Sequence, residues 1–172
     1  RRVLFRSLLS AFFWSYALMQ IPMGVLADRV NLRWLYAGAF TLWSIAQGLM
    51  GLADGLGLLI AFRILLGIGE AVYLPGGSKI VSLLFQPAER GLPSGLFDAG
   101  TRTGLVVEGV LVPWMLLRFD WRMSFMLVGF AALIWLLPWF LIMPAGLRSP
   151  APPPAARTES AGDVFEIGRA HV

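Results

Sequence analysis

The chain has 172 residues, of which 58% are hydrophobic and 14% charged, with a mean hydropathy of +0.73. A soluble domain carries about 25% charged residues, so this composition indicates a membrane protein. Cysteine is absent and the one histidine, His171, is the second-last residue, which leaves almost nothing for metal binding or for Ser-His and Cys-His catalysis. No glycine-rich phosphate loop follows a strand pattern. We therefore expect neither an enzyme nor a protein that holds a metal or another cofactor.

Both ends of the chain resemble a translated sequencing adapter. The first seven residues, RRVLFRS, and the last seven, EIGRAHV (residues 166–172), can be encoded by one DNA segment read on opposite strands. Segments of this kind are left out of fold reasoning, and they suggest a gene fragment whose own sequence begins near residue 8. Without the four arginines and the one glutamate of these tails, the formal net charge of +4 falls to +1. The basic balance therefore does not predict nucleic-acid binding.

Five apolar segments follow one another, each about long enough to cross the hydrocarbon core of a bilayer. They cover residues 8–26, 34–53, 58–84, 91–117 and 123–143, with short polar turns between them. A Pro/Ala-rich linker, residues 144–165, follows the last segment. The predicted fold is all-α, with five transmembrane helices in residues 8–143. Pro75-Gly76-Gly77 predicts a bend in the third helix, and the glycines of the fourth predict close helix packing.

The distribution of arginine predicts the orientation of these helices. The first and third turns and the linker hold five arginines between them, whereas the second turn has none. Basic loops favour the cytoplasmic side, so the first helix would run from outside to inside, which suggests a further helix before it. The fourth turn, with Arg118 and Arg122, opposes this assignment. Lys79, near the cytoplasmic end of the third helix, is expected to extend toward the interface.

Two opposite charges lie inside the third predicted helix. Arg63 and Glu70 are seven residues apart, which places them on one helix face, about 10 Å apart along the axis. A charge that faces lipid costs at least about 2.5 kcal/mol, so both are expected to face protein or a water-filled cavity. Such groups usually mark a binding or coupling site. A purely structural pair that holds helices in register is the alternative.

Other polar side chains within the helices are further candidates. Tyr16 and Gln20, one turn apart in the first helix, would line the same cavity or form hydrogen bonds between helices. Asp98 and Arg102 have the spacing of an ion pair and are expected to serve structure or gating. Glu108 lies mid-helix without a neutralising neighbour. It would be a second titrating group, or it would partner a residue outside this chain.

The turn after the first helix reads GVLADRVNLR. It resembles the signature loop of the major facilitator superfamily, G-x-x-x-D-R/K-x-G-R-R, between the second and third helices of that fold. In the family this loop latches the two halves of the transporter in one state. The resemblance gives this role to Gly24, Asp28, Arg29 and Arg33. Asn31 stands where glycine is usual and Leu32 where arginine is usual, so we expect a weaker latch. An ordinary positive-inside loop is the alternative.

With that placement, the five predicted helices correspond to helices two to six. RILLGIGEA, which contains Arg63 and Glu70, is similar to helix four of the anion:cation symporter family, a group that includes bacterial sugar-acid/proton symporters. The stretches FQPAERG, GTRTG and DWRMSF also resemble this family, so the likeness covers almost all of residues 8–143. It implies that Arg63 engages the carboxylate of an organic anion and that Glu70 takes part in proton coupling. Tyr16 would offer its hydroxyl to the same anion.

The chemistry of these side chains agrees with such roles. A guanidinium group is permanently charged and binds a carboxylate in a two-pronged geometry. A carboxyl group in a partly dry cavity can take up a proton near neutral pH. An anion bound at Arg63 would remove the positive charge that supports ionised Glu70. The anion and the proton would therefore load together.

The sequence thus predicts part of the N-terminal six-helix half of a major facilitator fold. The intact protein would be a multi-pass transporter of the cell membrane that moves a sugar acid or similar carboxylate together with protons. Without the first helix and the C-terminal half, this fragment is expected to be inactive. Two alternatives stay open. One is a non-transporting helical module such as a receptor or scaffold, and the other is a facilitator of another subfamily with a different substrate.

Overall fold

The computed structural model describes residues 2–148. The predicted linker beyond Arg148, the predicted C-terminal tail (166–172) and His171 lie outside the described residues. Within residues 2–148 every regular element is a helix, which confirms the all-α fold class. The α-helices are α1 (Arg2–Arg29), α2 (Leu32–Leu49), α3 (Leu56–Glu70), α4 (Tyr73–Leu84), α5 (Gly91–Arg118), α6 (Trp121–Ala132) and α7 (Leu136–Ile142). Short 3-10 turns lie at Met50–Leu52, Pro87–Glu89 and Leu133–Trp135.

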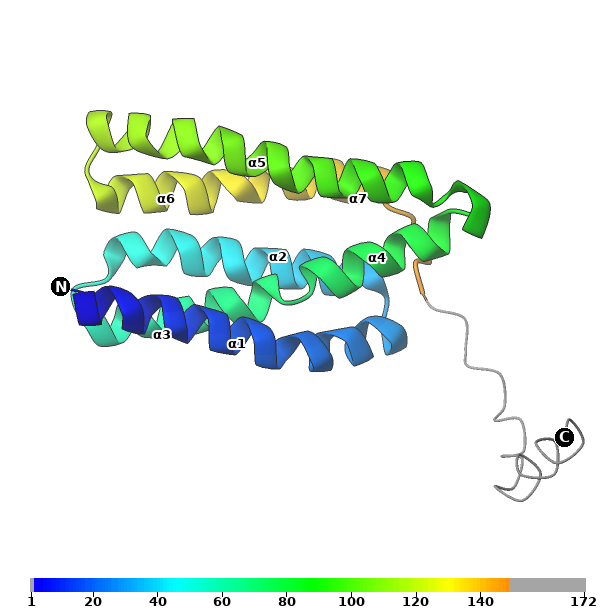
Figure 1. Cartoon of the computed structure of the whole chain (residues 1–172), viewed down its shortest axis with the longest axis horizontal. Helices are drawn as coiled ribbons and strands as arrows, with labels where there is room; N and C mark the ends of the chain where they lie inside the picture. Colours follow the sequence, from blue (N-terminus) through cyan, green and yellow to red (C-terminus); the bar gives the residue numbers. More distant parts are fainter. Residues whose placement is uncertain (1, 149–172) are drawn as a thin grey trace, which may run out of the picture.

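The helices lie along one long axis, and the chain reverses direction at each of the four turns between the predicted spans (Figure 1). α3 and α4 together form the third predicted helix, and α6 and α7 together form the fifth. In the view of Figure 1, α1 to α4 occupy one side of the bundle and α5 to α7 the other. The first turn, the α4–α5 connector and the end of α7 share one end of the bundle. Successive turns therefore lie at opposite ends of the bundle, as predicted.

Three stretches are long and apolar enough to cross a membrane: Arg6–Arg29, Leu56–Leu84 and Trp121–Ile142. The other two predicted transmembrane helices, α2 and α5, are formed but are less apolar. α5 carries Asp98, Arg102 and Glu108 within its length. Charges at these positions need protein or water around them if the helix spans a bilayer.

The third predicted helix is broken at Ala71 and Val72, between α3 and α4. Pro75 has no backbone N–H, so it cannot donate to the carbonyl of Ala71 four residues earlier. The Gly76 N–H still donates to the Val72 carbonyl at 2.8 Å, and helical bonding resumes from there. The predicted bend is therefore present, and it lies one turn before the Pro-Gly-Gly sequence that causes it. As a consequence, Glu70 is the last residue of α3.

Glycines set the closest approaches between α3 and its neighbours. A Cβ on Gly67 would collide with the Ser15 hydroxyl of α1 and lie 2.7 Å from the Phe12 carbonyl oxygen. A Cβ on Gly69 would lie 2.8 Å from the Ala39 carbonyl oxygen of α2. Helix α3 is thus held between α1 and α2 at backbone contact distance, the packing that small residues allow in membrane helices.

The glycines of α5 behave differently from the prediction. An added Cβ would meet nothing within 4 Å at any of Gly91, Gly95, Gly100, Gly104 and Gly109. Met115 is the only buried residue of α5 among those described, and the helix touches the rest mainly through α4 and α6. The prediction that these glycines mark close helix packing is wrong for the described residues. Glycine permits a close approach but does not by itself attract a second helix.

We expect Gly69→Ala to lower the free energy of unfolding by about 1–3 kcal/mol, because the facing Ala39 carbonyl belongs to a helix backbone and cannot move aside. Gly38→Ala in α2 is the matched control, since a Cβ there meets nothing within 4 Å. The control should be neutral or slightly stabilising through helix propensity. Thermal unfolding of the detergent-purified variants measures both effects. Equal melting temperatures for the two variants would contradict the packing assignment.

Candidate functional site

Arg63 and Glu70 both lie on α3, and both side chains are half-buried. The two groups interact electrostatically within the bundle. The helix between them presents buried Leu66, Gly67 and Gly69 to α1 and α2. The pair therefore lies on a helix packed on two sides by protein, which is the environment that two charges inside a membrane segment require.

Tyr16 of α1 lies close to the Arg63–Glu70 pair. Its backbone passes Gly67 closely, with the Tyr16 amide nitrogen 3.0 Å from the position of an added Cβ. The Tyr16 hydroxyl interacts with the Gln20 side chain one turn further along α1, and it lies within electrostatic range of Glu70. Gln20 also lines a hollow of about 390 Å³ between α1 and α4. The fold thus brings the two polar residues of α1 to the same region as the charges of α3.

Glu108 lies on α5 and is exposed. It lines a second, larger hollow of about 560 Å³ between α5 and α6, which is bounded by Gln47 of α2. Glu108 also interacts electrostatically with Glu70, although the two residues lie on different helices. Whether Glu108 is a second functional carboxylate or partners a residue outside this chain, the two interpretations left open by the sequence, remains a prediction. Arg63 and Glu70 themselves line neither of these two hollows.

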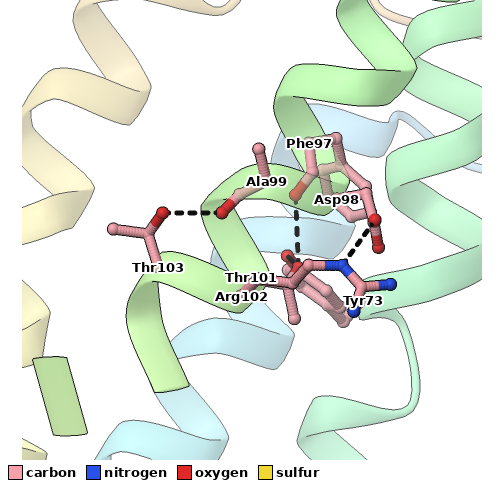
Figure 2. Close-up of polar contacts among 7 residues, drawn as sticks. All are labelled: Tyr73, Phe97, Asp98, Ala99, Thr101, Arg102 and Thr103. Atoms are coloured by element: carbon pink, nitrogen blue, oxygen red, sulfur yellow. Dashed lines mark hydrogen bonds and ion pairs between the residues drawn. The ribbon is translucent and has the colours of Figure 1, made fainter. Parts of the chain in front are cut away.

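The contact between α4 and α5 contains polar and aromatic residues that were not predicted as candidates from the sequence (Figure 2). The Tyr73 and Thr101 hydroxyl oxygens lie 2.7 Å apart, and the Tyr73 ring stacks on Phe97 with centroids 4.7 Å apart. A Cβ on Gly77 would collide with the Phe97 ring, so the glycine at this position of α4 leaves room for the aromatic side chain. The available signal was the position of Tyr73, three residues after Glu70.

Asp98 and Arg102 form the predicted ion pair on α5 (Figure 2). The Arg102 Nε donates to the Asp98 Oδ2 at 2.9 Å, and the two side chains are 77% and 63% exposed. The pairing is therefore confirmed. A role in structure or gating remains a prediction.

Asp28 of the signature loop pairs with Lys79. The Lys79 Nζ lies 2.7 Å from the Asp28 Oδ1, which ties the last turn of α1 to α4. Lys79 therefore extends toward the last turn of α1, and its position relative to a membrane interface remains a prediction. Gly24 lies opposite Pro75 of α4, where an added Cβ would be at an ordinary contact distance of 3.9 Å. Arg29 is exposed.

Arg33 contacts the end of α7 and does not join Asp28. Its Nη2 donates to the Phe140 carbonyl at 2.6 Å, and its guanidinium lies 5.2 Å from the centre of the Phe140 ring. The Trp139 indole N–H donates in return to the Arg33 carbonyl at 3.0 Å. Cations near a helix C-terminus satisfy carbonyls and complement the helix dipole. Within this part of the chain, Arg33 therefore holds the end of α7 against the start of α2.

Asn31 also connects the start of α2 to the segment that follows α7. Its Oδ1 accepts from the Arg33 N–H at 2.9 Å and caps α2, while its Nδ2 donates to the Ala145 carbonyl at 2.5 Å. The next residue, Leu32, is fully buried, and its N–H donates to the Leu147 carbonyl at 2.8 Å. Both departures from the signature loop thus have a structural role. A glycine at position 31 could form neither side-chain hydrogen bond.

We expect Asn31→Gly to lower the free energy of unfolding by about 1 kcal/mol, through loss of the cap and of the bond to Ala145. Asn31→Ser is the matched variant, because its hydroxyl can keep the capping acceptor while the shorter side chain cannot reach the Ala145 carbonyl. Its loss should be smaller. Melting temperatures in detergent test this order. An Asn31→Gly protein as stable as the parent would show that the two side-chain hydrogen bonds of Asn31 contribute nothing to stability.

No group of three or more His, Cys, Asp and Glu that could hold a metal occurs among residues 2–148. What the described chain offers is a helical bundle with a half-buried cation and a half-buried carboxylate, Arg63 and Glu70, on one of its packed helices. Ionisable groups placed inside membrane helices in this way are the mark of proteins that move ions or charged solutes.

The chain belongs to the Major Facilitator Superfamily, whose sequence profile matches residues 3–169. It is 38% identical over 120 residues to the uncharacterized transporter YybO of Bacillus subtilis (strain 168), and 37% identical over 133 residues to a D-galactonate transporter of Escherichia coli O6:H1. It is 33% identical over 131 residues to a hexuronate transporter of Bacillus subtilis. These matches cover 70%, 77% and 76% of this chain. The predicted resemblance to sugar-acid transporters is confirmed, and these relatives are transporters and not enzymes.

The fold has a counterpart among solved structures. A bacterial homolog of the human lysosomal transporter Spinster, in an inward-facing and unoccupied conformation, matches with a TM-score of 0.64 over 92% of this chain and 39% of that one. At 24% identity the likeness shows the fold alone. The chain spans only 28–31% of the length of the three relatives above. It therefore contains part of a major facilitator fold.

Proposed function

We propose that the full-length protein carries a small organic anion of the sugar-acid class across the cell membrane, coupled to protons. The observation that carries this proposal is the Arg63–Glu70 pair on α3, held between α1 and α2. The names of the relatives, which include D-galactonate and hexuronate transporters, support the substrate class. Membership of a transporter superfamily disfavours a receptor or a scaffold. Those sugar-acid relatives favour this substrate class over that of another subfamily.

In this proposal, Arg63 binds the carboxylate of the substrate. Its planar guanidinium group keeps its charge at any physiological pH and can donate two parallel hydrogen bonds. Tyr16 and Gln20 contribute further hydrogen-bonding groups from α1. Tyr16 lies within electrostatic range of Glu70, on the helix that also carries Arg63. The protein then alternates access by rocking its two halves around this site.

Glu70 is the proposed proton carrier, with Glu108 beside it. The nearby charge of Glu108 disfavours the ionised form of Glu70 and so favours uptake of a proton by Glu70. When Arg63 engages an anion, its charge no longer supports ionised Glu70. Loading of the anion and loading of the proton then favour each other, which is the thermodynamic content of symport.

The signature loop is proposed to keep its latch role in the full-length protein through Gly24, Asp28 and Arg29. Asp28 is already bound to Lys79 at 2.7 Å within the described part of the chain. A latch to a second half would have to share or replace this ion pair. Arg33 is turned to α7, so its share in the latch would be indirect.

The first transport prediction concerns Arg63. We expect Arg63→Lys in the full-length protein to weaken sugar-acid binding by about 10- to 100-fold, because a charge-assisted hydrogen bond to the carboxylate is lost while the charge is kept. Arg148→Lys, at an exposed position beyond α7, is the matched control. Uptake of D-galactonate and D-galacturonate into proteoliposomes measures KM. An unchanged KM for Arg63→Lys would remove Arg63 from the anion site.

The second concerns Glu70. We expect Glu70→Gln to abolish accumulation of substrate against its gradient while substrate exchange continues, because the amide cannot carry a proton. Proton uptake induced by substrate, recorded with a pH dye in the same proteoliposomes, should also disappear. Glu89→Gln, at an exposed position in the α4–α5 connector, is the control. Uphill uptake by Glu70→Gln with the pH dependence of the parent would rule out this coupling scheme.

A further inference from the structure

We propose that the hydroxyl groups of Tyr73 and Thr101 form a subsite that binds the hydroxyl groups of the substrate. This inference rests on the proposed function, and it names the part of the site that distinguishes a polyhydroxylated acid from a plain carboxylate. Neither side chain is charged, and neither residue belongs to the site predicted from the sequence. Figure 2 shows the two side chains meeting between α4 and α5.

The position of Tyr73 places it beside the charged pair. It is the first residue of α4, directly after the break that follows Glu70. Tyr16 of α1 lies within electrostatic range of both Tyr73 and Glu70. The Tyr36 hydroxyl of α2 lies 3.5 Å from the Tyr73 carbonyl. The Tyr73 backbone thus contacts α2, while its hydroxyl reaches α5.

The hydrogen-bonding pattern leaves the two hydroxyl groups with free acceptor capacity. The Thr101 hydroxyl donates to the Phe97 carbonyl at 3.2 Å, so its proton is used within α5. The contact of 2.7 Å between Thr101 and Tyr73 then uses the proton of Tyr73. Both oxygens keep lone pairs and neither has a proton to offer. A substrate hydroxyl can donate to such a pair, whereas an ionised carboxylate cannot.

The subsite is accessible from the open face of α5. Thr101 is exposed and Tyr73 is half-buried, and the neighbouring Asp98 and Arg102 neutralise each other as an ion pair. The Phe97 ring stacked on Tyr73 fixes the tyrosine in place with centroids 4.7 Å apart. An acceptor held rigidly in this way discriminates between ligands better than a mobile one, because little order is lost on binding.

The two ends of the proposed site therefore have opposite chemistry. Arg63 attracts a carboxylate, and Tyr73 with Thr101 accepts from hydroxyl groups. Ten residues of helix separate Arg63 from Tyr73, about 15 Å along the axis, and Glu70 lies between them. A sugar acid would bind with its carboxylate toward Arg63 and its hydroxylated chain toward α5. A site that uses hydrogen bonds to a substrate hydroxyl rejects analogues that lack it.

The experiment compares two inhibitors of D-galactonate uptake by the full-length protein in proteoliposomes. D-gluconate has hydroxyl groups along its chain, and hexanoate has the same number of carbon atoms and none. The inhibition constant of hexanoate divided by that of D-gluconate measures recognition of hydroxyl groups. We expect Tyr73→Phe and Thr101→Val each to lower this ratio by about three- to tenfold. Thr101→Ser, which keeps the hydroxyl, should restore it.

Thr103→Val is the matched control. The Thr103 hydroxyl donates to the Ala99 carbonyl at 2.8 Å on the same helix but does not meet Tyr73 (Figure 2). This variant should keep the ratio of the parent. If Tyr73→Phe and Thr101→Val lower only the maximal rate and leave the ratio unchanged, the hydroxyl pair is a helix contact and the subsite is refuted. If the parent protein takes up no sugar acid at all, the proposed function itself has failed, and the subsite falls with it.

Discussion

The structure depends on one constraint, which is that charges placed inside a membrane helix must be enclosed by protein or water. Arg63 and Glu70 on α3 impose this constraint. It is met because Gly67 and Gly69 let α1 and α2 close on α3 at backbone contact distance. The same contacts bring Tyr16 beside Glu70. The site and the tightest packing of the bundle are therefore parts of one arrangement.

The break between α3 and α4 connects this packed region to α5, on the opposite side of the bundle. Pro75 removes one helical hydrogen bond, which ends α3 at Glu70 and begins α4 at Tyr73. The aromatic side chain after the break then reaches Phe97 and Thr101 of α5. A single local feature of the backbone thus connects the charged pair to the helix that carries Glu108. Breaks of this kind in transporter helices commonly lie next to the substrate.

The end of the bundle that carries the first turn is organised by hydrogen bonds to backbone carbonyls. Asn31 and Arg33 hold the end of α7, and Asp28 holds α4 through Lys79. Charged side chains that the family resemblance assigns to a latch between halves therefore also connect helices within this part of the chain. The departure from the signature loop at position 31 strengthens the internal connection, since a glycine there would form no side-chain bond.

The sequence by itself determined the features that depend on neighbours along one helix. Apolar length gave five helical segments, and the spacing of Arg63 from Glu70 and of Asp98 from Arg102 followed from helical periodicity. Only the tertiary structure decided which helices face one another: that Glu108 interacts with Glu70, that Lys79 pairs with Asp28 and that Asn31 reaches Ala145. It also showed that an added Cβ would meet nothing within 4 Å at the described glycines of α5. The physical reason is that periodicity is a property of a single helix, whereas contacts between helices depend on how each is rotated and crossed in the bundle.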